Sequence, residues 1–153
     1  MALSNEPRPR PRALIALFWA QVAAFALMLG TIFLPFLEAF FRPAFLTLMG
    51  ACFILGLALS ILSARAKPIG ALKCFWILTG ASSAGLTFFS ALHNAFYALA
   101  TLAGERPLLE QTIQGLEVAS FIIGILVCPV GFVVGAVGAI VILIRRGKQG
   151  GPA

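Results

Sequence analysis

The chain has 153 residues, of which 61% are hydrophobic and 10% are charged, and its formal net charge is +6. Apolar stretches fill nearly all of the sequence between residues 13 and 144, which excludes a soluble domain of useful size. The basic residues lie at the ends of these stretches and not on one solvated face, so we expect no nucleic-acid partner. The composition predicts one domain embedded in a lipid bilayer.

Residues 1–12 form a basic tail in which positions 7–12 read Pro-Arg-Pro-Arg-Pro-Arg. This alternation cannot form a helix, so we predict an extended, disordered segment beside the inner leaflet. The alternative is a binding site for anionic lipid headgroups, to which each basic residue near the surface contributes ~1 kcal/mol. The basic tail at 145–153 is similar in kind.

Four long apolar stretches follow the first tail, at about 13–37, 43–64, 72–103 and 116–144. Each reaches the ~20 residues that a helix needs to cross ~30 Å of hydrocarbon. The short gaps between them make sequential helices antiparallel neighbours. We therefore predict an all-α polytopic membrane protein, an up-down antiparallel bundle of four transmembrane helices.

The basic residues sort by side when the gaps alternate across a bilayer. Nine of the 11 fall on one side, namely Arg8, Arg10, Arg12, Arg65, Lys67, Lys73, Arg145, Arg146 and Lys148. Only Arg42 and Arg106 fall on the other side. The positive-inside rule makes the richer side cytoplasmic, so segments 38–42 and 104–115 become outer loops. We predict a multi-pass protein of the cell inner (plasma) membrane with both termini cytoplasmic.

Two spans differ from plain membrane anchors. The third is long enough for ~48 Å of helix, so we expect it to emerge on the outer side, where His93, Asn94 and Tyr97 lie. The fourth contains Pro129, which cannot donate a hydrogen bond to the carbonyl of Ile125. That loss predicts a kink in the fourth helix.

A polar stripe follows one face of the third span. Its members are Thr79, Ser83, Thr87, Ser90, Asn94, Tyr97 and Thr101. At ~100° per residue they fall within an arc of about 80°. Hydroxyls in lipid usually bond a neighbouring helix or a carbonyl of their own helix, which favours a structural role. The functional alternative is a water-lined path or a narrow groove for a polar ligand.

The outer end of the bundle carries the residues that are candidates for chemistry. His93 is the single histidine, and Asn94 and Tyr97 lie near it. Three carboxylates could approach from the outer loops, namely Glu38, Glu110 and Glu117. The group suggests a proton-handling or cation site, with a histidine that only hydrogen-bonds at the interface as the alternative. One histidine cannot supply the paired ligation of a b-type haem, so we expect no metal and no cofactor.

Small residues recur at helical spacing in the fourth span, where Gly131, Gly135 and Gly138 form one face. Such faces let helix backbones approach closely, because lipid provides little hydrophobic force between helices. The simpler interpretation is packing within one bundle. The alternative is a contact between protomers or with a partner subunit.

Three segments carry a distinctive pattern: Leu-Thr-Gly-Ala-Ser-Ser-Ala-Gly at 78–85, Leu-His-Asn with Tyr97 at 92–97, and Val-Cys-Pro-Val-Gly-Phe-Val-Val-Gly-Ala-Val-Gly at 127–138. In these segments the sequence resembles a group of small uncharacterised prokaryotic four-span membrane proteins. The resemblance covers only the third and fourth spans. It implies that these two helices form the shared core of the group, and it carries no activity.

The functional prediction rests mainly on missing features. No charged residue lies deep in a span, no cysteine pair suits thiol oxidation, and no nucleophile and base stand together. We therefore favour a non-catalytic structural or accessory subunit of a larger membrane complex or a homo-oligomer. One alternative is a small channel or transporter that uses the polar stripe. The other is a membrane enzyme with an outer-face site around His93.

Overall fold

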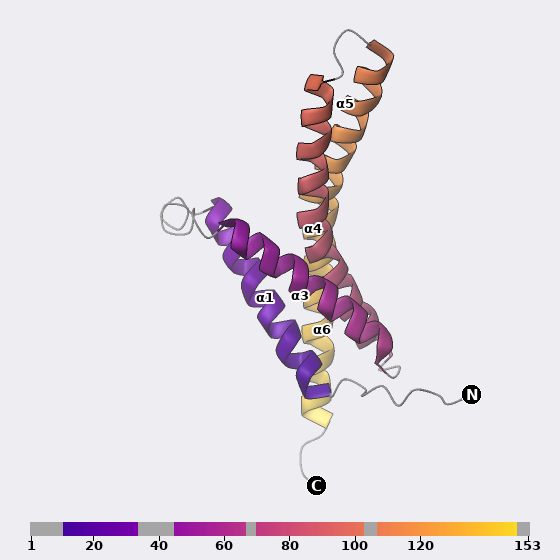
Figure 1. The fold of residues 1–153 in the computed structure, drawn as a ribbon. Helices are drawn as coiled ribbons and strands as arrows, with labels where there is room; N and C mark the ends of the chain where they lie inside the picture. The colour runs from indigo at the N-terminus through magenta and orange to yellow at the C-terminus, as the bar shows by residue number, and fades with distance from the viewer. Residues whose placement is uncertain (1–10, 34–44, 67–69, 103–106, 150–153) are drawn as a thin grey trace, which may run out of the picture.

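The computed structural model describes residues 11–33, 45–66, 70–102 and 107–149. Every secondary-structure element in these ranges is helical, which confirms the predicted all-α class (Figure 1). The elements are α1 (Pro11–Phe33), α3 (Phe45–Arg65), α4 (Ala71–Leu102), α5 (Pro107–Ile122), η2 (Ile123–Val127) and α6 (Cys128–Gln149). Because α5, η2 and α6 are continuous, the described ranges contain four helices that are long and apolar enough to cross a membrane.

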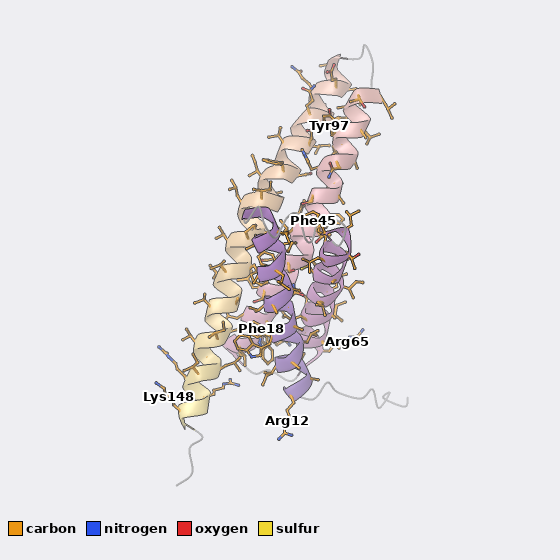
Figure 2. The ribbon with its side chains drawn as sticks, turned by 90° about the vertical axis from the view of Figure 1, so that its left-hand side faces the viewer. Arg12, Phe18, Phe45, Arg65, Tyr97 and Lys148 are labelled. Atoms are coloured by element: carbon orange, nitrogen blue, oxygen red, sulfur yellow. The ribbon has the colours of Figure 1, made fainter. Side chains whose placement is uncertain are left out.

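Consecutive helices run in opposite directions, and α4 lies at the centre (Figure 1). It packs against α3, α5, η2 and α6, while α1 packs mainly against α3. An aromatic pair also connects α1 with α6, because Phe25 stacks on Phe132 with ring centroids 3.7 Å apart. Figure 2 shows Arg12, Arg65 and Lys148 at one end of the molecule, so α1 begins at the end where α3 and α6 finish.

A lysine near the start of α4 caps the C-terminal end of α3. The Lys73 ammonium donates hydrogen bonds to the carbonyl oxygens of Ala64, at 2.7 Å, and Ala66, at 3.4 Å. A basic side chain satisfies the otherwise unpaired carbonyls at a helix C-terminus and suits its partial negative charge. Gly70 has φ +65, a left-handed conformation that glycine adopts without steric strain.

The predicted outer loop at 104–115 is wrong over most of its length, because α5 begins at Pro107. Proline is tolerated in the first turn of a helix, where its missing N–H would have no partner. Gln114 Nε2 then donates to Glu110 Oε1 at 3.0 Å, a pair one helical turn apart that supports the helix. Residues 38–42 and 103–106 lie outside the described residues, as do 1–10 and 150–153 of the tails.

Two helices extend well past the other two. The 32 residues of α4 measure about 48 Å at ~1.5 Å per residue, whereas the 21 residues of α3 measure about 32 Å. In both views α4 and α5 continue beyond α1 and α3, and Figure 2 shows Tyr97 well past Phe45. We call residues 92–102 of α4 and 107–122 of α5 the arm.

A π-helical turn joins α5 to α6 at the position where the sequence predicted a kink. Residues Ile123–Val127 form η2, and the Cys128 N–H donates to the carbonyl oxygen of Ile123, five residues earlier. Pro129 follows directly and has no N–H to donate. Such wide turns inside long helices are often found at functional sites.

Candidate functional site

A half-open pocket lies at the base of the arm, between α4 and the α5–η2 segment. Its volume is about 170 Å³. The residues that line it are Ser90, His93, Asn94, Ser120, Phe121, Gly124 and Ile125. Most of the lining surface is apolar, with a few polar groups around it. This is the usual composition of a small-molecule site.

His93 and Glu117 pair across the two helices beside this pocket. The Nδ1 atom of His93 lies 3.3 Å from the Glu117 carbonyl oxygen and 3.7 Å from its Oε1 atom. Their side chains are 29% and 20% exposed, so solvent reaches both only partly. Both oxygens are acceptors, so we assign a proton to Nδ1.

The wall of the pocket formed by α5 and η2, which we call the second wall, carries an aromatic residue and two small residues. The Phe121 ring lies 5.2 Å from the imidazole of His93, measured between ring centroids. A methyl group built on Gly124 would lie 3.4 Å from Cβ of Phe89, so α4 and η2 approach closely at this level. Ser120 donates to the carbonyl oxygen of Leu116 at 2.8 Å, which leaves its oxygen free to accept.

The structure brings together only part of the predicted outer group. Glu117 pairs with His93, and Asn94 lines the pocket while it donates to the carbonyl oxygen of Ser90 at 2.8 Å. Tyr97 is 60% exposed on the arm, and Glu110 pairs with Gln114 on the exposed face of α5. Glu38 lies outside the described residues.

Sequence reasoning missed the second wall of the pocket. Ser120, Phe121 and Gly124 belong to a helix whose first half was predicted as a loop. The spacing of Glu117, Ser120 and Gly124 contained the signal, because residues three, four and seven apart share one helix face. That face would have placed a serine and a glycine beside the carboxylate.

The polar stripe of α4 divides into two parts. Thr79 donates to the Phe75 carbonyl at 2.8 Å, Ser83 to Cys52 at 3.3 Å, and Thr87 to Met49 at 3.3 Å. Thr79 and Ser83 are fully buried. Farther out, Ser90 lines the pocket, and Thr101 donates to the Ala98 carbonyl at 2.7 Å on the exposed arm.

A buried glutamine on α1, also missed from sequence, joins the inner part of the stripe. Gln21 Nε2 donates to Ser83 Oγ at 2.5 Å, and Ser83 in turn donates to the Cys52 carbonyl. The chain of hydrogen bonds therefore connects α1, α4 and α3. Gln21 Oε1 is buried without a hydrogen-bond partner in the structure.

The glycine face of α6 packs against α4 of the same chain. A Cβ atom on Gly135 would lie 2.6 Å from Thr79 Oγ1 and 2.7 Å from its backbone nitrogen. One on Gly131 would overlap Ser82, and one on Gly138 would overlap the Phe75 ring. These contacts match the packing interpretation, and α4 occupies the surface that the alternative assigned to a second subunit.

Charges separate along the molecule. Figure 2 shows Arg12, Arg65 and Lys148 at one end of the bundle. The other described Lys and Arg residues lie toward the same end, because Lys73 bonds the end of α3, and Arg145 and Arg146 are in the last turns of α6. The described carboxylates, Glu110 and Glu117, lie on the arm. Among the described residues no three His, Cys, Asp or Glu side chains are grouped so that they could hold a metal ion.

The fold and the site define the class: over its described residues the protein is all-helical, with four helices of membrane-spanning length and a small pocket where two of them leave the bundle. No protein-family model, no curated protein and no solved structure matches this chain. The resemblance to small prokaryotic membrane proteins in α4 and α6 therefore stays a prediction.

Proposed function

We propose that this protein is a non-catalytic accessory subunit of a larger complex in the cell inner membrane, with both termini cytoplasmic. The basic end of the bundle would face the cytoplasm, where Arg12, Arg65 and Lys148 meet anionic lipid headgroups. The arm would lie at the outer surface.

The observation that carries the proposal is the uncovered arm. A helix crosses ~30 Å of hydrocarbon in ~20 residues. If α4 enters the hydrocarbon at Lys73, at the basic end, it reaches the outer boundary of the hydrocarbon near His93. Leu102 and Leu108 lie farther out, and each is 81% exposed. Leu99 on the same arm is also exposed. Apolar side chains grouped beyond the lipid favour a protein partner that covers them.

The closed interior supports an accessory subunit over a channel. Ser83 and Thr87 of the stripe donate to carbonyls of α3, and Thr79 donates within its own helix. Gly56 and Gly80 bring α3 and α4 into backbone contact at the same level. A hydroxyl that is bonded to a neighbouring helix and buried offers little surface to water.

Site-specific photocrosslinking in native membranes tests the proposal. A photoreactive residue replaces Leu102 on the arm, and in the control it replaces Ile54 on α3, which is also highly exposed, at 67%. We expect Leu102 to give a discrete adduct with a larger protein that co-purifies in mild detergent, and Ile54 to react with lipid. Lipid adducts alone at Leu102 would refute the accessory role. An adduct of twice the mass of the chain would replace the larger complex by a homo-oligomer.

A further inference from the structure

We propose that the pocket beside His93 and Glu117 binds the ammonium head of a small amphiphile, held by the Glu117 carboxylate and by the Phe121 ring. The inference does not rest on the accessory role, because the pocket is formed within one chain. It concerns a ligand, whereas the arm concerns a protein partner.

The size of the pocket limits the part of the ligand that it can enclose. Its volume of about 170 Å³ slightly exceeds that of the engineered cavity of ~150 Å³ that accommodates benzene in another protein. One ring with a short polar arm fits this space, as does the polar head of a lipid whose chains remain outside. Phe121 and Ile125 are both about half exposed, so an apolar body could continue along the lipid-facing side of η2.

The charge at this end selects a cation. Among the described residues, Glu117 is the only acidic group close to the pocket, and its Oε1 atom lies 3.7 Å from Nδ1 of the lining residue His93. Among the residues that the structure describes, the Lys and Arg side chains are all toward the opposite end. An anionic ligand would find no described cation at the pocket, whereas an ammonium would find a partly desolvated carboxylate.

The remaining lining residues suit an ammonium group in particular. The face of an aromatic ring attracts cations, and Phe121 is one of the residues that line the pocket. Ser120 Oγ and Asn94 Oδ1 can accept from an N–H group, since the hydroxyl of Ser120 and the amide nitrogen of Asn94 already donate to their own helix. A ligand with three N–H donors can thus be satisfied by oxygen atoms from both walls.

Two sources supply such a head: a free organic amine and an aminolipid of the outer leaflet. Both present the same ammonium, and the position near the outer boundary of the hydrocarbon is accessible to both. The test therefore has two parts: the first measures binding, and the second identifies the source of the ammonium group.

Binding is measured by fluorine NMR titration of the full-length protein in detergent with para-fluorobenzylamine, and with para-fluorobenzyl alcohol as its neutral isostere. We expect the amine to bind more tightly than the alcohol, and Glu117→Gln to weaken the amine about tenfold because a charge-assisted hydrogen bond is lost. Glu117→Asp should recover part of the affinity. Glu110→Gln is the matched control. It also removes one negative charge from α5, but Glu110 pairs with Gln114 away from the pocket.

Equal affinity for amine and alcohol, no binding of either, or equal losses in Glu117→Gln and Glu110→Gln would overturn the proposal. A cooperative thermal unfolding transition confirms that each variant is folded. If Glu117→Gln does not fold, the affinity of Glu117→Asp for the amine tests the proposal in its place. In the second part of the test, each lipid competes with the bound para-fluorobenzylamine. Displacement of the amine by phosphatidylethanolamine but not by phosphatidylglycerol identifies an aminolipid, whereas displacement by neither lipid identifies a free amine. Equal displacement by both lipids would also overturn the proposal.

Discussion

Gly56 on α3 and Gly80 on α4 face each other at backbone contact. A Cβ atom on Gly56 would lie 2.6 Å from the carbonyl oxygen of Gly80, and one on Gly80 would lie 2.5 Å from that of Gly56. Gly135 of α6 approaches Thr79 on another face of α4 in the same way. The central helix is thus held between two close crossings, which is how helices associate where lipid provides little hydrophobic force.

The first prediction concerns this crossing. Gly56→Ala should destabilise the protein by about 1 to 3 kcal/mol, because the added methyl group forces the two backbones apart. Gly50→Ala on the same helix is the control, since a Cβ atom there meets nothing within 4 Å. The free energy of unfolding in mixed detergent micelles measures both. Equal stability of the two variants would show that the crossing is looser than described.

The second prediction separates packing within the chain from association between chains. Gly135→Leu should lower the free energy of unfolding, because its side chain would overlap Thr79 of α4. The oligomeric size in detergent should not change, since α4 already covers this face. Light scattering of the purified protein measures the size. A change in size with unchanged stability would restore the contact between protomers.

The sequence predicted the apolar helices well and their polar extensions poorly. The third span was predicted at 72–103, and the structure places α4 at Ala71–Leu102. A hydropathy scale identifies segments that are buried in lipid, whereas a helix that continues past the lipid can be polar. Glu110 and Gln114 lowered the hydropathy of 107–115, yet their hydrogen bond one turn apart supports the helix there.

Hydrogen bonds between side chains on different helices could not be predicted. The sequence of a uniformly apolar helix does not show which of its faces turns toward a neighbouring helix. Gln21 is the one amide in α1, and nothing in the sequence pairs it with Ser83, which lies 62 residues farther along the chain. The approach of Glu117 to His93 was among the expected contacts. The pocket beside them could not be predicted, because it depends on how α5 is aligned with α4, and this follows only when the helix is known to extend to Pro107.

The third prediction tests the hydrogen bonds of Ser83. Ser83→Ala removes the acceptor for Gln21 and the donor to Cys52, so it should cost about 1 to 2 kcal/mol at ~0.6 kcal/mol or more per interhelical bond. In the Gln21→Leu background the same change should cost less, because one of the two bonds is already absent. A double-mutant cycle on unfolding free energies measures this coupling. Strict additivity would mean that the two side chains do not interact.

The fourth prediction concerns orientation. After Cys74 is replaced by serine, because it is the exposed cysteine among those described, Lys148→Cys should react with a membrane-impermeant maleimide only from the cytoplasmic side. Thr112→Cys on the arm should react in intact cells. Each variant serves as the control for the other. Labelling of Lys148→Cys from outside would reverse the proposed topology.

The last prediction addresses the channel alternative through Thr87. Its hydroxyl donates to the Met49 carbonyl at 3.3 Å, so Thr87→Val should cost only about 0.6 kcal/mol, the average for an interhelical hydrogen bond. Liposomes with the wild-type protein should release small solutes no faster than empty liposomes, because the inner stripe is bonded to α3 and buried at Ser83. Thr101→Val on the exposed arm is the control, since its hydroxyl bonds only its own helix. Solute flux through the wild-type protein could instead exceed that of empty liposomes. If Thr87→Val abolished this flux and Thr101→Val retained it, a pore along α4 would replace the accessory role.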